Sequence, residues 1–215
     1  MATPQEVLAN IHWLGHDSFK IVDDKIIYID PWKLKRADPA NLILVTHDHG
    51  DHLSPADIKK IRTKDTVVVT IAAGAKKLSG PVRTVKPGDR LTVQGIEIEA
   101  VPAYNVSKFR APGQPFHPRQ QGHVGFIVTV DGVRIYHTGD TDVIPEMEGL
   151  DVDIMLVPVS GTYVMTAEEG AEAARIVQPK IAVPMHYGAI VGSDQDARRF
   201  KKLCQVPVHI LKRSE

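Results

Sequence analysis

The residues with the clearest chemical potential are the seven from Thr46 to His52, Thr-His-Asp-His-Gly-Asp-His. They bring together three imidazoles and two carboxylates, directly after the apolar run Leu42-Ile43-Leu44-Val45. Neutral imidazole nitrogens and carboxylate oxygens are good ligands for borderline divalent metals such as zinc. Packing alone rarely requires such a cluster, because every buried ring nitrogen and carboxylate would need its own hydrogen-bond partner. The segment therefore predicts a metal site rather than a polar loop that is rich in histidine by chance.

The order His-x-His-x-Asp-His after an apolar strand resembles the signature of the metallo-β-lactamase superfamily. His47, His49, Asp51 and His52 match that signature residue by residue. The resemblance implies that His47 and His49 bind a first metal, and that Asp51 and His52 bind a second one.

Two later segments resemble the remaining ligand motifs of the superfamily, in the same order along the chain. In Tyr136–Thr141, Asp140 matches the aspartate that bridges the two metals. In Pro184–Gly188, His186 matches the histidine that completes the second site. The segments 12–19 and 29–31 also look like the branch that contains ascorbate-6-phosphate lactonase and phospholipase-D-type members.

One ligand implied by the resemblance is missing. The third histidine for the first metal would follow a Pro-Ala step, but Asn105 stands there, after Pro102-Ala103-Tyr104. An amide oxygen is a poorer ligand for zinc than an imidazole nitrogen. We predict that His117 replaces the missing ligand, and His123 and Asn105 itself remain as alternatives.

Several other side chains are expected to support the ligands or to contact the substrate. Asp30 and His137 are placed to orient metal-binding side chains by hydrogen bonds, as such outer partners commonly do. His16 is expected to line the site in the same way or to contact substrate, with a packed histidine as the alternative. Tyr163, after a buried strand, could donate to a developing oxyanion, or could simply be a packed aromatic ring. His12 and His209 are expected to have no role in the site.

With these residues, the resemblance implies a hydrolase with two divalent cations, with zinc expected and manganese or iron as alternatives. Two cations roughly 3.5–4 Å apart can activate a hydroxide and clamp the oxygens of a substrate. Asp51 or Asp140 would orient the hydroxide and accept its proton. The resemblance favours cleavage of an ester, lactone or phosphodiester bond, and His49 in its motif position favours hydrolysis over diiron oxygen chemistry. The alternatives are a nuclease or phosphodiesterase acting on nucleic acid, and a non-catalytic metal-binding module, which the Asn105 departure would allow.

The composition indicates a small-molecule substrate rather than a polyanionic or membrane partner. Lys plus Arg and Asp plus Glu both number 26, so no global field attracts nucleic acid or anionic lipid. No signal peptide is visible at the N-terminus, and no apolar run approaches the ~18 residues needed to span a bilayer. The lone Cys204 excludes an internal disulfide. We expect a cytoplasmic protein, and the sequence leaves its oligomeric state open.

The segment 105–121 is long for a connection in a compact domain, which is typical of a functional or mobile loop. It carries Lys108, Arg110 and Arg119. These side chains could take an anionic group of the substrate, although solvated loop charge is the more common explanation.

The elements that would position these residues alternate between strands and helices. Strands are expected at 19–22, 25–29, 42–45, 66–71, 90–93, 96–100, 126–130, 133–136, 153–157, 180–183 and 206–211. Helices are expected at 55–62, 167–177 and 194–203, the first with Ser54 as N-cap and the second with a Thr166–Glu169 capping box. Segment 81–90 is expected to be a plain connection. The pattern indicates an α/β or α+β protein, and the resemblance implies one domain, 1–215, with a four-layer αββα sandwich of two mixed sheets and outer helices.

Overall fold

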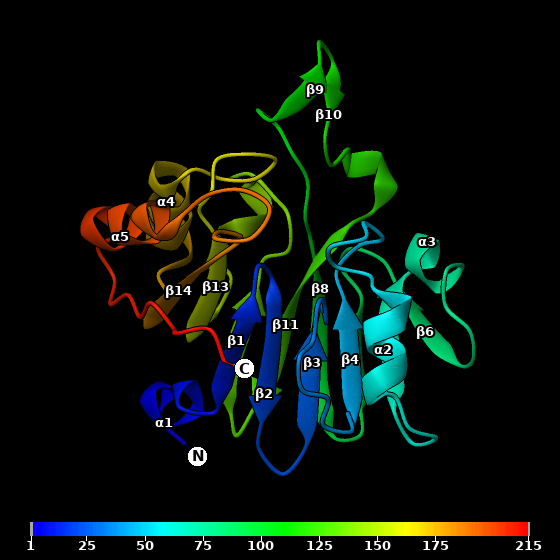
Figure 1. The fold of residues 1–215 in the computed structure, drawn as a ribbon. Helices are drawn as coiled ribbons and strands as arrows, with labels where there is room; N and C mark the ends of the chain where they lie inside the picture. Colours follow the sequence, from blue (N-terminus) through cyan, green and yellow to red (C-terminus); the bar gives the residue numbers. More distant parts are fainter. Residues whose placement is uncertain (1, 215) are drawn as a thin grey trace.

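Two six-stranded mixed sheets pack against each other in the computed structural model, which describes residues 2–214 (Figure 1). The first sheet contains, in spatial order, β1 (Ile11–Gly15), β2 (Ser18–Val22), β3 (Ile26–Ile29), β4 (Leu42–Val45), β5 (Val67–Ile71) and β6 (Val82–Val85). The second contains β14 (Ile181–Met185), β13 (Ile154–Pro158), β12 (Val133–His137), β11 (Val124–Val130), β8 (Ile96–Pro102) and β7 (Arg90–Val93). Each sheet has antiparallel hairpins at one side and three or more parallel strands at the other.

Strand β4 shows why its sequence is continuously apolar. Leu42 and Leu44 lie in the core between the two sheets, whereas Ile43 and Val45 belong to a second core that includes Ile58 of a covering helix. Successive side chains of a strand point to opposite faces, so a strand covered on both faces needs no polar positions. The apolar run therefore ends where strand β4 ends, and the cluster of candidate ligands follows directly.

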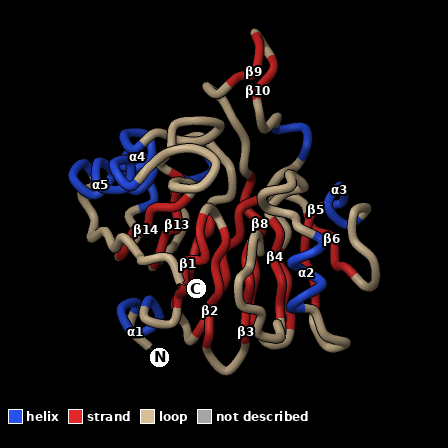
Figure 2. Tube along the Cα trace, viewed as in Figure 1, coloured by secondary structure: helices blue, strands red, loops and turns tan. Residues whose placement is uncertain are grey.

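Helices cover the outer faces of both sheets and complete four layers (Figure 2). The first sheet is covered by α2 (Pro55–Ile61), with α3 (Ala72–Ala75) beside β5 and β6. The second is covered by α4 (Ala167–Val177) and α5 (Asp194–Leu203), which pack on each other and on β13 and β14. A short α1 (Pro4–Leu8) precedes β1, and two single 3-10 turns lie at Arg119–Gln121 and Pro145–Met147. None of the helices within residues 2–214 has the length and apolar character needed to cross a bilayer.

The predicted helix starts are confirmed by their caps. The Ser54 side chain accepts a hydrogen bond from the backbone N–H of Asp57 at the start of α2. Thr166 and Glu169 form the complete capping box of α4. Helix α4 ends at Gln178, which adopts a left-handed conformation (φ 53°) just before Pro179.

Several segments differ from the expectation, which included no element for α1, β1 or α3. Segment 206–211 is not a strand; Val208 makes only an isolated bridge to Ala182, and Pro207 has no N–H to extend a ladder. Segment 81–90 contains β6, an edge strand whose Arg83 and Thr84 are exposed, so its sequence lacks the apolar signal of a buried strand. Segment 105–121 folds partly into a small hairpin, β9 (Phe109–Ala111) and β10 (Gln114–Pro115), which stands away from the sheets at the top of Figure 1.

Candidate metal centre

The first group of candidate ligands comes from the end of β4 and from the long 105–121 segment. Ligand atoms of His47, His49 and His117 lie within 4.8 Å of one another. His47 Nε2 and His49 Nδ1 are 3.1 Å apart, and His117 Nε2 lies 3.3 Å from an oxygen of Asp140. His47 and His117 are buried, and His49 is partly exposed. We call this group the first position.

Asn105, the residue that departs from the superfamily pattern, holds His117 in place. Its side-chain oxygen accepts hydrogen bonds from both the backbone N–H (2.8 Å) and the ring Nδ1 (2.9 Å) of His117. Its amide donates to Asp142 (3.1 Å) and to the backbone carbonyl of Tyr163 (2.9 Å). Because Nδ1 carries the proton, the lone pair of His117 Nε2 is free for a cation. His117 thus lies where the missing ligand is expected, with Asn105 behind it.

His123, the other alternative, lies behind the first position. Its ring stacks on His47 with centroids 4.8 Å apart, and it belongs to none of the three groups of ligand atoms found among the described residues. Its backbone carbonyl accepts a hydrogen bond from Ala103. The geometry therefore favours His117 over His123.

The second group of candidate ligands, which we call the second position, combines carboxylates with histidines. His52 Nε2 lies 3.8 Å from Asp51 Oδ2 and 3.4 Å from Asp140 Oδ1. His186 Nε2 lies 3.5 Å from Asp140 Oδ2. His52, Asp140 and His186 are buried, whereas the Asp51 side chain keeps 28% of its surface exposed. The loops after β4, β12 and β14 bring these residues together from both sheets.

Asp140 lies between the two positions and contacts both. Its Oδ2 lies 3.3 Å from His117 Nε2 and 3.5 Å from His186 Nε2, and its Oδ1 faces His52. A carboxylate that contacts histidines of both positions could be shared by two cations.

Outer hydrogen bonds fix the orientation of the rings. Asp30 Oδ2 accepts from His52 Nδ1 (2.8 Å) and from Thr46 Oγ1 (2.6 Å). Thr46 Oγ1 also lies 3.0 Å from His47 Nδ1, so Asp30 supports one ring directly and another through Thr46. Ser160 Oγ lies 2.9 Å from His186 Nδ1. These bonds all involve Nδ1, which leaves Nε2 of each ring as the candidate ligand atom.

The turn between β1 and β2 closes the second position. His16 Nε2 lies 3.1 Å from Asp51 Oδ2, and the backbone carbonyl of His16 accepts from the backbone N–H of His186. His137 Nε2 donates to the carbonyl of Asp17 (2.9 Å), while its Nδ1 accepts from the N–H of Gly139 (3.2 Å). His137 therefore holds the turn against the loop that carries Asp140, rather than contacting a ligand ring.

The rings of the two positions differ in pKa. Burial lowers the pKa of His47 well below its usual value and lowers that of His117 to about 4. Burial acts in the same direction on His52, but Asp140 and Asp30 outweigh it and raise its pKa well above the usual value. Similarly, Asp17 and Asp140 outweigh burial and raise the pKa of His186 to about 9. The buried histidines of the first position are therefore neutral, whereas those of the second carry protons that a bound cation would displace.

Unpartnered buried polar atoms at the second position fit a divalent cation. His52 Nε2, His186 Nε2 and Asp140 Oδ1 are buried and have no hydrogen-bond partner. Unpartnered buried polar atoms are costly and rare in folded proteins. Here they converge on one place, as the donor atoms of a metal site should.

Other predicted residues lie at the rim. Tyr163 is 37% exposed, and its ring packs edge-on against Phe116, with centroids 4.7 Å apart. Lys108 pairs with Glu169 at 2.7 Å, and Arg119 pairs with Glu146 at 2.6 Å. These two basic residues thus tie the 105–121 segment to the rest of the protein.

Three residues that the sequence analysis did not select contribute to the site. Asp17 lies beside His52 and His186, Ser160 contacts His186, and Asp142 anchors the 105–121 segment by accepting from the backbone of Val106 and Ser107. The only sequence signals were that Asp17 follows His16 and that Asp142 lies two residues after Asp140.

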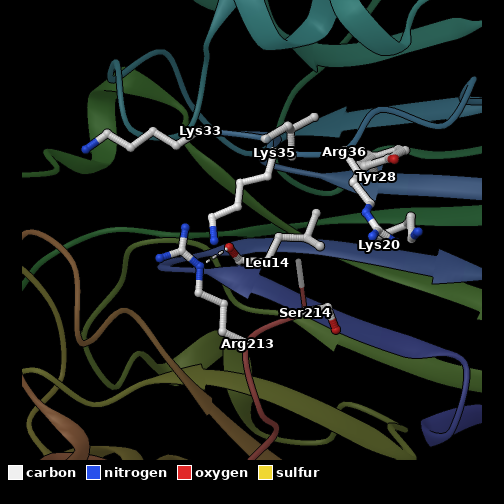
Figure 3. A pocket seen from close by; sticks show the side chains of 9 residues that line it. Leu14, Lys20, Tyr28, Lys33, Lys35, Arg36, Arg213 and Ser214 are labelled. Carbon is white, nitrogen blue, oxygen red and sulfur yellow. Dashed lines mark hydrogen bonds between the residues drawn. The ribbon is translucent and has the colours of Figure 1, made fainter.

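A small cavity beside β1 is separate from this centre (Figure 3). Its lining is basic, with Lys20, Lys33, Arg36 and Arg213, and Arg213 Nε donates to the carbonyl of Leu14 at 2.8 Å. Its volume of about 20 Å³ is near that of a single water site. It holds no candidate ligand and is too small for a substrate.

Known proteins resemble this chain over most of its length. Residues 10–186 match the family described as a Beta-lactamase superfamily domain. A protein of Pyrococcus abyssi named UPF0173 metal-dependent hydrolase is 36% identical, over 91% of this chain and 92% of the relative. A protein of Methanoculleus marisnigri with the same family name is 34% identical, over 88% and 86% of the two chains.

Solved structures share the fold. A crystal structure of a protein from Parabacteroides distasonis superposes with a TM-score of 0.82 at 37% identity, covering 94% of this chain and 93% of the other. Igni18, described as a metallo hydrolase from Ignicoccus hospitalis, superposes with a TM-score of 0.75 at 21% identity, covering 95% of each chain. At that lower identity the likeness concerns the fold alone.

Proposed function

This chain belongs to the metallo-β-lactamase superfamily, within the UPF0173 metal-dependent hydrolases, and we propose that it uses two divalent cations to hydrolyse an ester, lactone or phosphodiester bond of a small molecule. The observation that carries the proposal is the position of Asp140. This buried carboxylate faces three imidazoles and contacts ring nitrogens of both positions. A single-metal structural site would not need two groups of ligands that share one residue.

The first position would be formed by His47, His49 and His117, and the second by Asp51, His52 and His186. Cations bound there would supply a hydroxide nucleophile at neutral pH and stabilise the negative charge that develops on the substrate. Zinc suits the imidazole-rich first position, and manganese or iron are alternatives at the second.

The chain's own carboxylates would divide the remaining work. Asp140 is nearly buried, and the neighbouring His52 and His186 hold its pKa well below the usual range against the effect of burial, so it stays ionised as the bridge. Asp51 is the more exposed of the two. It can accept a proton from the attacking water and pass it to the leaving group, while His16 holds its carboxylate through a hydrogen bond.

Tyr163 is proposed as a residue that contacts the substrate. Its backbone carbonyl is tied to Asn105, so it lies on the same hydrogen-bonded unit as His117. Its partly exposed hydroxyphenyl group could donate a hydrogen bond to an oxyanion.

Two observations weaken the alternative functions, an enzyme that acts on nucleic acid and a non-catalytic metal-binding module. Equal numbers of acidic and basic residues give no general attraction for nucleic acid. The non-catalytic interpretation depended on a missing ligand, and Asn105 is instead hydrogen-bonded to a histidine that lies in the ligand group.

The test is metal content by mass spectrometry, combined with assays on small aryl esters, lactones, an aryl phosphodiester and a single-stranded RNA. We expect about two metals per chain and turnover of a small substrate that stops with chelator and returns with metal. Asp51→Asn removes a ligand of the second position and the proton acceptor together, so it should lose turnover, which excludes a contaminating hydrolase. Two metals without any turnover would support the non-catalytic module, and turnover of RNA alone would support the nuclease.

A further inference from the structure

Asp17 is a buried carboxylate for which the fold provides no hydrogen-bond partner. It lies in the turn between β1 and β2, has no exposed surface, and both of its oxygens lack a hydrogen bond. A buried ionised carboxylate is retained when it is paired, hydrogen-bonded or bound to a metal. The surroundings of Asp17 should therefore show what it binds.

The carboxylate points to the second position. Asp17 Oδ2 lies 3.7 Å from His52 Nε2, 3.8 Å from His186 Nε2 and 3.4 Å from His16 Nε2. Ligands that bind one cation at about 2.0–2.2 Å are separated from one another by roughly 3–4 Å. Asp17, His52, Asp140 and His186 form one of the groups whose ligand atoms all lie within 4.8 Å.

The turn does not need this side chain for its own shape. The Asp17 carbonyl accepts from His137, and the His16 carbonyl accepts from the Trp13 indole N–H and the His186 backbone. Gly15 (φ 110°) and His16 (φ 55°) provide the left-handed backbone that the tight turn requires. The backbone is therefore held by other groups, and the carboxylate is left for a ligand.

We propose that Asp17 is a direct ligand of the second metal, in addition to Asp51, His52, Asp140 and His186. This inference rests on the proposed two-metal centre and goes beyond it by giving the two positions different preferences. Five protein ligands, three of them carboxylates, suit a five- or six-coordinate hard cation such as Mn²⁺ or Fe²⁺. The first position, with three imidazoles and the shared carboxylate, suits four-coordinate zinc.

The experiment loads metal-free protein with one equivalent per chain each of Zn²⁺ and Mn²⁺, so that zinc cannot fill both positions, then removes the unbound metal and measures both by mass spectrometry. The parent should hold about one zinc and one manganese per chain. Asp17→Asn should keep the zinc, which reports an intact fold and first position, and bind manganese at least about 10-fold more weakly. Asp153→Asn is the matched control, because Asp153 is a carboxylate paired with Lys180 away from the centre, and it should behave as the parent.

The outcomes separate this inference from the proposed function. A parent that binds fewer than two metals contradicts the two-metal centre itself, whatever Asp17 does. A parent with two metals and an Asp17→Asn variant that binds manganese with parental affinity overturns the inference alone, and makes Asp17 only a counter-charge for the histidines.

A measurement on the parent covers the case in which Asp17→Asn does not fold. Protein already loaded with one zinc is titrated with Co²⁺, whose visible absorption reports its coordination number. Weak absorption, typical of five or six ligands, is expected. The strong absorption of four-coordinate cobalt would overturn the inference.

Discussion

The two positions of the candidate centre use the same residue types in opposite electrostatic settings. Burial and the surrounding imidazoles lower the pKa of His117 in the first position to about 4, although Asp140 opposes them. His186 in the second position faces Asp17 and Asp140, and its pKa rises to about 9. The comparison shows that the balance between burial and nearby carboxylates, rather than residue type, decides whether a buried histidine is neutral or protonated.

Asp140 is the one residue on which both positions depend, so its loss should have the largest effect. Asp140→Asn removes the shared charge, and we expect less than one metal per chain and a fall in turnover of more than about 100-fold, the upper range for losing an outer-shell partner. Metal analysis and the assays described above measure both. The control is Asp48→Asn, whose carboxylate pairs with Lys77 at 2.6 Å near the rim. An Asp140→Asn protein that keeps two metals would contradict the bridging role.

His117 separates the positions, because it belongs to the first one only. His117→Ala should lose about one metal per chain and most activity, and it should retain the metal of the second position. His123→Ala is the matched control, since His123 is an equally buried histidine next to His47, and it should keep both metals. The reverse pattern, with metal lost only from His123→Ala, would transfer the ligand role to His123.

Sequence could predict the parts of this molecule that depend on neighbouring residues. The Asp131-Gly132 turn between β11 and β12, the apolar run of β4 and the caps of α2 and α4 are encoded within a few positions. The placement of Asp140 and His186 could be anticipated only through the family resemblance, because spacing along the chain does not show which loops meet.

The remaining features depend on contacts between distant segments. Asn105 and Asp142 are 37 residues apart, and Asp17 and His186 are 169 apart, so no local pattern reveals that they meet. Asn105 departs from the motif in sequence, and only the fold brings it to hydrogen-bond distance of His117, 12 residues away. The expected strand at 206–211 is reduced to a single bridge to Ala182 at the edge of β14, because Pro207 has no N–H to extend the pairing.

Removing a hydrogen bond to the Nδ1 of a candidate ligand histidine should weaken metal binding at one position only. Asn105→Ala removes the acceptor for His117 Nδ1, and Ser160→Ala removes the partner of His186 Nδ1. Each change should weaken metal binding about 10- to 100-fold, at the first position for Asn105→Ala and at the second for Ser160→Ala. Competition with a chelator of known affinity gives both constants. If either variant weakened both metals equally, the two positions would be one coupled unit and the comparison would fail.

A substitution of Asp57 tests whether metal binding depends on the candidate ligands or on any buried carboxylate. It is 5% exposed and accepts hydrogen bonds from the backbone of Lys33 (2.8 Å) and Leu34 (3.2 Å), but it contacts no candidate ligand in the described structure. Asp57→Asn should lower the free energy of unfolding by about 1–3 kcal/mol, the usual value for hydrogen bonds to a charged group. The metal content should stay at the parental level.

The pH dependence of that loss has a definite sign. Although burial opposes it, hydrogen bonds from Lys60, Ser54 and the backbone lower the pKa of Asp57 in the folded protein. Its stabilising contribution is therefore present above the unfolded value of about 3.9, and it disappears as the pH falls through the lower, folded value. Denaturant unfolding of parent and Asp57→Asn should converge only in acid. If Asp57→Asn lost metal near neutral pH, a buried carboxylate that contacts no candidate ligand would be needed for metal binding. The difference between the two positions could then not be attributed to their ligands.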